Sequence, residues 1–456
     1  MNNENRSKAT QEILSEYRLY SYDSDNNSFI EKAGIYAPSF PVVIKSDGTV
    51  WDKAALYLNH LLKEGKSSKL LKTVACDLLD FLRFMEEKEI DMLHAPIEKE
   101  LRVTYWYRQG LIFRENLSRN TASQRIARIV AFYEYCFEKR LFTKEELKNR
   151  LPKHLSDKFY KKVKVNVWRN NAQGFAMQIQ RETTDLSIPR KPRSGQASNA
   201  IQDGRQLHPL SPEEQEIFKA YLEVHGSRVF QLICSIAINT GARIQPICTL
   251  RISDIEKMKK GNIVKGSLKS LTIGSTTTVD NKQDKRYSVF FPNWLVDELD
   301  NYIKSEEWLE RARKSYYKNG DNYVFLSKFG SALYTSKKEI KDRKERKYST
   351  DKNFKEKSGE SVRKCLNDIW LLMKKNGEPI RKFSIHDLRA TFGLNLLKAL
   401  DNTQLLTQHE ILEEIKERMG HSSRLTTERY LNYYARNKAY EKVSEKYTEI
   451  IYRFDN

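Results

Sequence analysis

The sequence lacks the residue patterns that mark several protein classes. It has no CxxC pair and no cluster of cysteine and histidine, so it predicts neither a zinc site nor a disulfide framework. No stretch reaches the ~18 apolar residues of a membrane span, and the polar N-terminus has no apolar signal-peptide region. We therefore expect a cytoplasmic protein without a membrane partner or a bound metal ion. Its five cysteines lie far apart, as core thiols in a reducing compartment do: Cys76, Cys136, Cys234, Cys248 and Cys365.

Positive charge, by contrast, is in excess. The 456 residues include 80 Lys and Arg against 60 Asp and Glu, a formal net charge of +20. Such an excess favours a polyanionic partner, because each phosphate that a protein neutralises releases condensed counterions. A content of 39% hydrophobic and 11% aromatic residues is enough to bury a sizeable core. Nucleic-acid binding in the nucleoid is the favoured class, and a basic soluble factor of another kind, such as a ribosome-associated protein, is the alternative.

The first half of the chain divides into three regions by pattern. Residues 1–48 are mixed and polar, and the pattern assigns them no fold. Residues 49–145 repeat apolar side chains at steps of three and four, in helices that begin at Ser68 and near Asn120, which predicts a small all-helical domain. Residues 146–207 are strongly basic and contain few acids, so they form a linker or insertion that either is simply solvated or contacts phosphates.

A second domain is predicted over 208–456. Ser211 followed by proline and then Glu214 has the pattern of a capping box at a helix start. Residues 263–291 contain two runs rich in β-formers around a polar tip, which predicts a strand pair. The highly charged stretch 335–364 is expected to be an exposed loop or an extension. The fold class is therefore mainly α with a small β-sheet (α+β).

Four short segments of the second domain hold residues suited to phosphate chemistry. Each segment alone also fits an ordinary surface or structural residue, so the interpretation depends on the order of the four segments along the chain. They are Arg243 after the turn Thr240-Gly241-Ala242, Lys282 in the tip of the predicted hairpin, His386 with Arg389 three residues on, and Gly420-His421 followed nine residues later by Tyr430.

Together these segments resemble the tyrosine recombinase (phage integrase) family. That family has an arginine after a T-G-x turn, a β-hairpin lysine, an H-x-x-R helix, and a G-H pair nine residues before a tyrosine. The resemblance covers about 205–440, and the helical region resembles the family's SAM-like core-binding domain. It implies a site-specific recombinase for integration or excision of a mobile element. The implied partner is a double-stranded recombination site, bound by a homotetramer, with room for accessory DNA-bending proteins.

The resemblance also implies a role for each residue. Tyr430 attacks the phosphodiester and forms a 3′-phosphotyrosyl link, while Arg243 and Arg389 stabilise the phosphorane through bidentate donors. His386 accepts a proton, since its ordinary pKa lies near neutrality. His421 donates to the phosphate or to the attacking oxygen. On this scheme the reaction uses no metal ion and no cofactor.

Some positions depart from the family pattern or have competitors. Pro246 stands where many members have a glutamate, which puts the support of the first arginine in doubt. Lys282, assigned by the resemblance to protonate the 5′-oxygen, is chosen by counting back from the second strand, and Lys285 is its competitor. Tyr433 and the adjacent Tyr434 compete with the proposed nucleophile. Two other functions remain open: a type IB topoisomerase-like nicking-closing enzyme, and a catalytically inactive DNA-binding protein.

Overall fold

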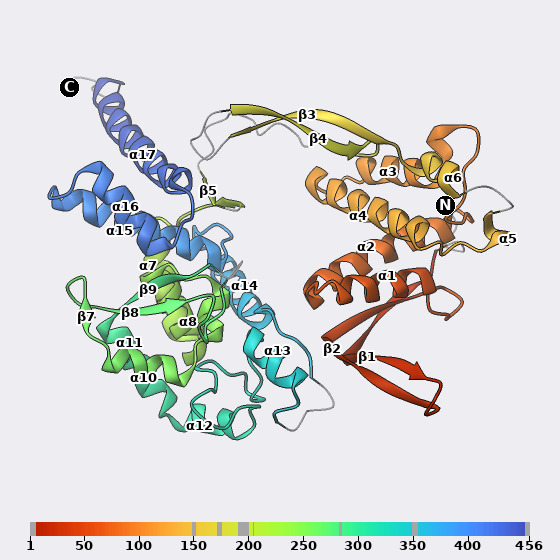
Figure 1. The fold of residues 1–456 in the computed structure, drawn as a ribbon. Helices are drawn as coiled ribbons and strands as arrows, with labels where there is room; N and C mark the ends of the chain where they lie inside the picture. The colour runs from red at the N-terminus through yellow and green to blue at the C-terminus, as the bar shows by residue number, and fades with distance from the viewer. Residues whose placement is uncertain are drawn as a thin grey trace. The chain divides into compact units, whose positions relative to one another are not determined.

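A computed structural model of the chain describes residues 6–147, 152–170, 176–189, 200–203, 205–281, 285–348 and 354–451. The chain divides into two compact units: the first comprises residues 1–195 and 351–355, and the second comprises residues 196–350 and 356–456. Both are mainly helical and carry small antiparallel sheets (Figure 1), which confirms the predicted α+β class. None of the described helices is long and apolar enough to cross a membrane.

The N-terminal segment, to which the sequence pattern assigned no fold, forms a long antiparallel hairpin. Strand β1 (Thr10–Asp23) pairs with β2 (Ser28–Ile44), with a register shift near the middle. The base of the hairpin packs on helices α1 (Asp52–Lys63) and α2 (Ser68–Glu87) through the buried side chains of Phe40 and Val43. Toward its tip, Phe29 is 72% exposed, so only one end of this hairpin belongs to the core of the first unit.

The helices of the first unit surround one apolar core, as their periodicity predicts. Ser118, two residues before the predicted Asn120, caps the helix α4, because its side chain accepts the amide of Thr121. The helices are α1 (Asp52–Lys63), α2 (Ser68–Glu87), the short η2 (Lys99–Leu101), α3 (Val103–Phe113), α4 (Arg119–Glu138), α5 (Lys144–Leu147) and α6 (Pro152–Phe159).

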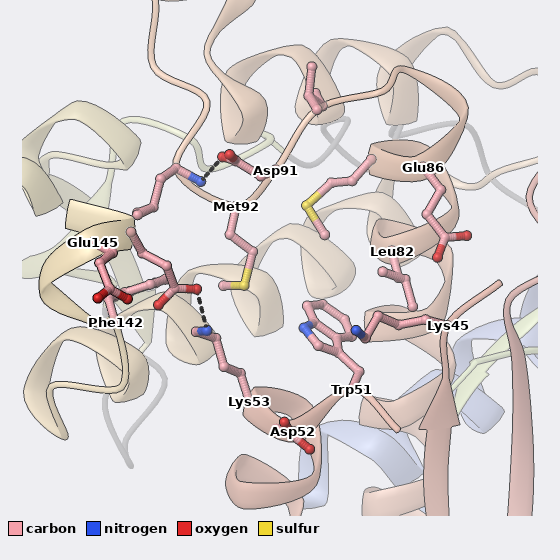
Figure 2. A pocket seen from close by; sticks show the side chains of 14 residues that line it. Lys45, Trp51, Asp52, Lys53, Leu82, Glu86, Asp91, Met92, Phe142 and Glu145 are labelled. Atoms are coloured by element: carbon pink, nitrogen blue, oxygen red, sulfur yellow. Dashed lines mark hydrogen bonds and ion pairs between the residues drawn. The ribbon is translucent and has the colours of Figure 1, made fainter. Parts of the chain in front are cut away.

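A pocket of about 410 Å³ opens among α1, α2, α5 and the loop after α2. Figure 2 shows apolar and charged side chains interspersed around it, with Phe142 beside Glu145 and Trp51 beside Lys45. None of the residues singled out for phosphate chemistry lines it. Five carboxylates line it against two lysines, Lys45 and Lys53. A lining with net negative charge repels a phosphate backbone, so this pocket is not where the predicted chemistry would occur.

The basic segment 146–207 holds more structure than the linker that its composition suggested. After α6 it forms the ribbon of β3 (Lys162–Asn170) and β4 (Ala176–Thr184), on which Trp168 is 72% exposed. Its last residues form a small hairpin, β5 (Ile201–Asp203) and β6 (Arg205–Leu207), that packs in the second unit. The second unit therefore includes this hairpin and begins before the residue 208 that was expected, because apolar side chains of the hairpin are buried against α15 (Ile385–Thr403) and α17 (Arg424–Ile451).

The second unit arranges helices around a three-stranded antiparallel sheet (Figure 1), with strand order β7-β8-β9. Its strands are β7 (Ile263–Val264), β8 (Leu268–Ile273) and β9 (Tyr287–Pro292), where a strand pair was predicted. Its helices are α7 (Pro212–His225), α8 (Arg228–Thr240), α9 (Ile244–Thr249), α10 (Ile252–Lys260), α11 (Asn293–Ile303), α12 (Glu306–Arg313), α13 (Lys337–Lys344), α14 (Glu360–Lys375), α15 (Ile385–Thr403), α16 (Gln408–Met419) and α17 (Arg424–Ile451).

Local sequence signals account for where several of these helices begin and end. Ser211 caps α7 in the predicted capping box, accepting the amide of Glu214 at 3.2 Å while its own amide donates to the Glu214 carboxylate at 2.9 Å. The same reciprocal pattern joins Ser384 and Asp387 at the start of α15. Helix α8 is buried along its length and packs against α15 and β9, so it positions the turn that follows it.

The charged stretch 335–364 is not simply an exposed loop, which was the first of the two alternatives expected for it. Helix α13 lies within it, and Glu339 and Arg343 are both buried and form an ion pair at 2.9 Å. Its neighbour Ser336 accepts a hydrogen bond from the buried Arg251, which also stacks 3.7 Å from the Tyr323 ring. The charges in this stretch are satisfied by one another and by aromatic faces, which composition alone does not reveal.

Candidate active site

The predicted residues of the second unit converge on one place, from three directions along the chain. Arg243 follows α8, His386 and Arg389 lie in the first turns of α15, and His421 and Tyr430 come from the end of α16 and the start of α17. Arg389, His421 and Tyr430 all approach a single oxygen, Oδ2 of Asp203 on β5. The distances to that oxygen are 3.8 Å from Arg389 Nε, 3.4 Å from His421 Nε2 and 3.4 Å from Tyr430 Oη.

Two glycine turns shape the site. Gly241 ends α8 with φ +66° and Gly420 ends α16 with φ +58°, left-handed conformations in which glycine is favoured. Arg389 is fully buried between these turns and donates to the carbonyl oxygens of Gly241 and, at 2.5 Å, of Met419. Its guanidinium therefore joins the two helix ends, which leaves Nε as the nitrogen directed toward Asp203.

The two histidines are neutral near pH 7. Burial, and after it the charge of the neighbouring Arg389, lower the pKa of His386 to about 4. Burial also lowers the pKa of His421, although the nearby Asp203 carboxylate acts in the opposite direction. The His421 ring is oriented by Nδ1, which lies 3.0 Å from the Thr427 hydroxyl. A neutral imidazole can accept a proton, as a general base must.

Tyr430 is fully buried, and its hydroxyl donates to Asp203 over 3.4 Å. Burial, and then the negative charge of Asp203, raise the pKa of this phenol above its ordinary value of 10. Its ring lies against the backbone of Gly393 in α15, where an added Cβ would come within 2.9 Å of Cε1. The absence of a side chain at residue 393 therefore allows the tyrosine to reach the site.

The side chain of Arg243 makes no hydrogen bond or ion pair with the part of the chain that the structure describes, although its backbone carbonyl accepts the amide of Ile247 at 3.2 Å. Burial and the neighbouring Arg389 charge lower its pKa, while the negative charge of Asp203 raises it. An arginine that is partly buried beside another cation, with its donors unused, can bind an anion that enters the site.

The choice of Lys282 as the hairpin lysine stays a prediction, because the structure does not test it. Lys282 lies outside the described residues. Its competitor Lys285 is in the site, where Nζ donates to the carbonyl oxygen of Gly420 at 2.8 Å. Burial and the charges of Arg243 and Arg389 lower its pKa. A lysine with a lowered pKa gives up a proton more readily than an exposed lysine.

Sequence reasoning missed Asp203 altogether. It lies within a basic segment that was interpreted as a linker, and only the fold brings it to residues more than 180 positions further along the chain. The available signal was Ile201 and Leu207, two apolar residues that bracket it and that the structure buries fully. Among the other expected competitors, the Tyr434 hydroxyl bonds to Asp401 at 2.8 Å.

The site has three basic side chains, Arg243, Arg389 and Lys285, against one carboxylate, and its histidines are neutral. Such a cluster can hold a phosphodiester and stabilise the additional negative charge of a phosphorane. Within the described ranges, no group of three or more His, Cys, Asp or Glu side chains is placed to hold a metal ion.

Comparison with known proteins matches residues 210–436 to the phage integrase family. Among solved structures, the chain is similar to the XerH site-specific recombinase bound to palindromic difH, with 15% identity, a TM-score of 0.44, and coverage of 87% of this chain and 88% of that one. It is also similar to the Tn1549 transposon integrase in complex with transposon right end DNA, at 14% identity and a TM-score of 0.42, covering 86% and 98%. A lambda integrase dimer bound to a COC′ core site matches at 12% identity and a TM-score of 0.43, covering 83% and 94%.

Proposed function

The chain belongs to the phage integrase family, the tyrosine recombinases, which break and rejoin DNA, and from this premise we propose that it cleaves a specific duplex site through a 3′-phosphotyrosyl intermediate on Tyr430. The observation that carries the proposal is the convergence of Tyr430, His421 and Arg389 at one anion position, with Arg243 and Lys285 beside it. These side chains come from separate segments whose order along the chain matches the family's.

The proposed reaction needs no energy source, because one phosphoester replaces another. Tyr430 Oη attacks the phosphorus, and the bond to the 5′-oxygen breaks. The phenolic proton passes to His386, which is neutral at pH 7 and can accept it. Lys285 gives a proton to the departing 5′-oxygen, for which its lowered pKa suits it. A 5′-hydroxyl of another strand then reverses these steps and releases the tyrosine.

The arginines supply the electrostatic part of catalysis. A phosphorane carries one more negative charge than the phosphodiester, and preorganised donors in a water-poor site stabilise it more than they stabilise the substrate. Arg389 cannot shift, because two backbone carbonyls hold it. Arg243 has its donors free for the phosphate oxygens. Loss of one such donor typically costs about 10²–10³-fold in rate.

We further propose that the substrate is a double-stranded recombination site of a mobile element, acted on by a homotetramer. Exchange of both strands between two duplexes requires four cleavages and hence four tyrosines. The excess of positive charge supplies the sequence-independent part of DNA affinity. The β3–β4 ribbon, with exposed Lys162, Lys164 and Trp168, is a candidate surface for that contact.

The decisive experiment is to trap the covalent intermediate in cells that express the chain. Protein denatured under conditions that preserve phosphotyrosyl bonds should carry DNA whose sequenced ends map to one recurrent site. Tyr430→Phe should abolish this DNA. Tyr433→Phe, a matched change three residues along the same helix, should retain it. Linked DNA that persists in Tyr430→Phe but is lost in Tyr433→Phe would show that the nucleophile is Tyr433. No linked DNA from the unaltered chain would leave a protein that binds DNA without cleaving it.

A further inference from the structure

Asp203 is an unusual residue to find at a site for DNA phosphate, since a carboxylate repels the substrate. Its pairing with the buried basic side chains has a simple physical reason. Arg389 is fully buried, and a buried cation without an anion is strongly disfavoured. In a chain without DNA, that anion has to come from the protein itself, and Asp203 supplies it.

The contacts of Asp203 match those expected of a scissile phosphate. The nucleophile Tyr430, His421 and Arg389 all approach the same atom, Oδ2 of Asp203. These are groups that the proposed function assigns to the phosphate oxygens or to the attack on phosphorus. A carboxylate and a phosphate both present oxygens with diffuse negative charge, so one position can accept either.

These contacts are also loose. His421 Nε2 and Arg389 Nε lie 3.4 and 3.8 Å from Oδ2, and neither nitrogen has a hydrogen-bond partner within the described residues. The planar carboxylate thus supplies charge without satisfying the donors. A tetrahedral phosphate can place separate oxygens at 2.7–3.0 Å from such donors, roughly the length of a good charge-assisted bond.

We propose that Asp203 is an internal substitute for the scissile phosphate, which keeps the active site closed in the free protein until DNA displaces it. The inference rests on the proposed function, because it takes the anion position to be that of the DNA phosphate. In the closed state Tyr430 is buried and donates to Asp203 instead of facing a phosphorus atom. The negative charge of Asp203 also raises the pKa of that phenol, which opposes its ionisation.

The hairpin that carries Asp203 is attached to the helices that carry the catalytic residues. Arg429, the residue before the nucleophile, donates to the carbonyl oxygen of Gln202 at 2.7 Å. On the other strand, Arg205 contacts Ser384 and Asp387 at the start of α15. Movement of Asp203 out of the site therefore acts directly on α17 and α15, the helices that present Tyr430 and His386.

The alternative role for the same contacts is that of a positioning residue, which would orient His421 and Arg389 throughout the reaction. The two roles make opposite predictions for Asp203→Asn, which keeps the size of the side chain and removes its charge. An inhibitory carboxylate slows the reaction, so its neutralisation speeds cleavage. A positioning carboxylate supports the reaction, so its neutralisation slows cleavage.

The first test uses inorganic sulfate, a tetrahedral dianion, as the probe. Thermal unfolding of the full chain is followed with increasing sodium sulfate, against sodium chloride of equal ionic strength. Asp203→Asn should unfold at a lower temperature than the unaltered chain and should regain about 3 °C or more as sulfate fills the vacated site. The unaltered chain and the charge-conserving Asp203→Glu should show little response to sulfate beyond that to chloride.

Asp300→Asn is the matched control, because Asp300 contacts the two cations Lys259 and Lys304 away from this site. It should lose stability without gaining a sulfate response. A response of Asp203→Asn no larger than that of the control overturns the proposal. So does failure of Asp203→Asn to fold both with and without sulfate, because the residue would then be structural.

The second test measures the rate at which adduct forms on a nicked duplex carrying the site mapped in cells, at limiting DNA. Asp203→Asn should react several-fold faster than the unaltered chain. A rate tenfold lower would make Asp203 a positioning residue and would overturn the proposal. Absence of adduct from the unaltered chain refutes the proposed function instead. The sulfate response, which needs no catalysis, would then still show whether Asp203 fills an anion site.

Discussion

Arg389→Lys tests whether one side chain both builds the site and acts on the phosphate. The arginine bridges the carbonyl oxygens of Gly241 and Met419 in a fully buried position, with Nε toward the anion. A lysine keeps the positive charge but has one nitrogen, so it cannot replace donors fixed in three directions. One carbonyl is left without its donor, and an unsatisfied buried polar group costs about 1–3 kcal/mol.

The expected result is therefore a loss of about 1–3 kcal/mol in the unfolding free energy of the second unit. Hydrogen exchange of peptides from α15 and α16 measures this loss separately from the first unit. Adduct formation in a single turnover should fall by about 10²–10³-fold, because the donor aimed at the phosphate is gone. Arg418→Lys is the control: Arg418 pairs with Glu414 on its own helix, and its replacement should leave cleavage nearly unchanged.

Two results would refute this reasoning. An unchanged unfolding free energy would mean that the bridge between the two glycine turns contributes no stability. An unchanged cleavage rate in a folded variant would mean that positive charge alone suffices at residue 389. An equal fall in the cleavage rate of Arg418→Lys would indicate a general effect of altering α15 or α16. Arg389 would then have no specific role toward the phosphate.

Three further predictions follow from neighbouring contacts. Gly393→Ala places a methyl group within 2.9 Å of the Tyr430 ring, so it should cost about 1–3 kcal/mol by overpacking and slow adduct formation; unchanged melting would contradict this packing. Because burial holds the pKa of His386 at about 4 against 6.5 in the unfolded chain, the unfolded state binds the extra proton between these values. The free energy of unfolding should fall by up to about 3 kcal/mol as pH drops from 6.5 toward 4. In denaturant titrations at several pH values, His386→Gln should reduce this dependence on pH. An equal dependence in the variant and the unaltered chain would contradict the buried, neutral His386. Lys285→Ala should slow cleavage of an ordinary duplex far more than cleavage of one with a 5′-phosphorothiolate leaving group, which needs no proton; if Lys282→Ala shows that pattern instead, Lys282 is the acid.

Much of the second unit was predictable from the sequence because the signals are local. The capping box at Ser211, the turn at Gly241 and the strand pair around 263–291 depend on residues within a few positions of one another. The first unit's helices followed from apolar periodicity for the same reason. The N-terminal hairpin did not, because its strands lack a regular alternation and their exposed end carries apolar side chains.

The candidate residues, and the order in which they occur, were determined by the sequence alone. Each belongs to a short motif that can be identified without knowing the fold: Arg243, His386, Arg389, His421 and Tyr430. Which other residues accompany them in the site was decided by the tertiary structure, because buried charges need partners that can lie far away along the chain. It placed Lys285 beside the arginines, and it carried Asp203 from an apparent linker to the one position where a carboxylate can take the place of a phosphate.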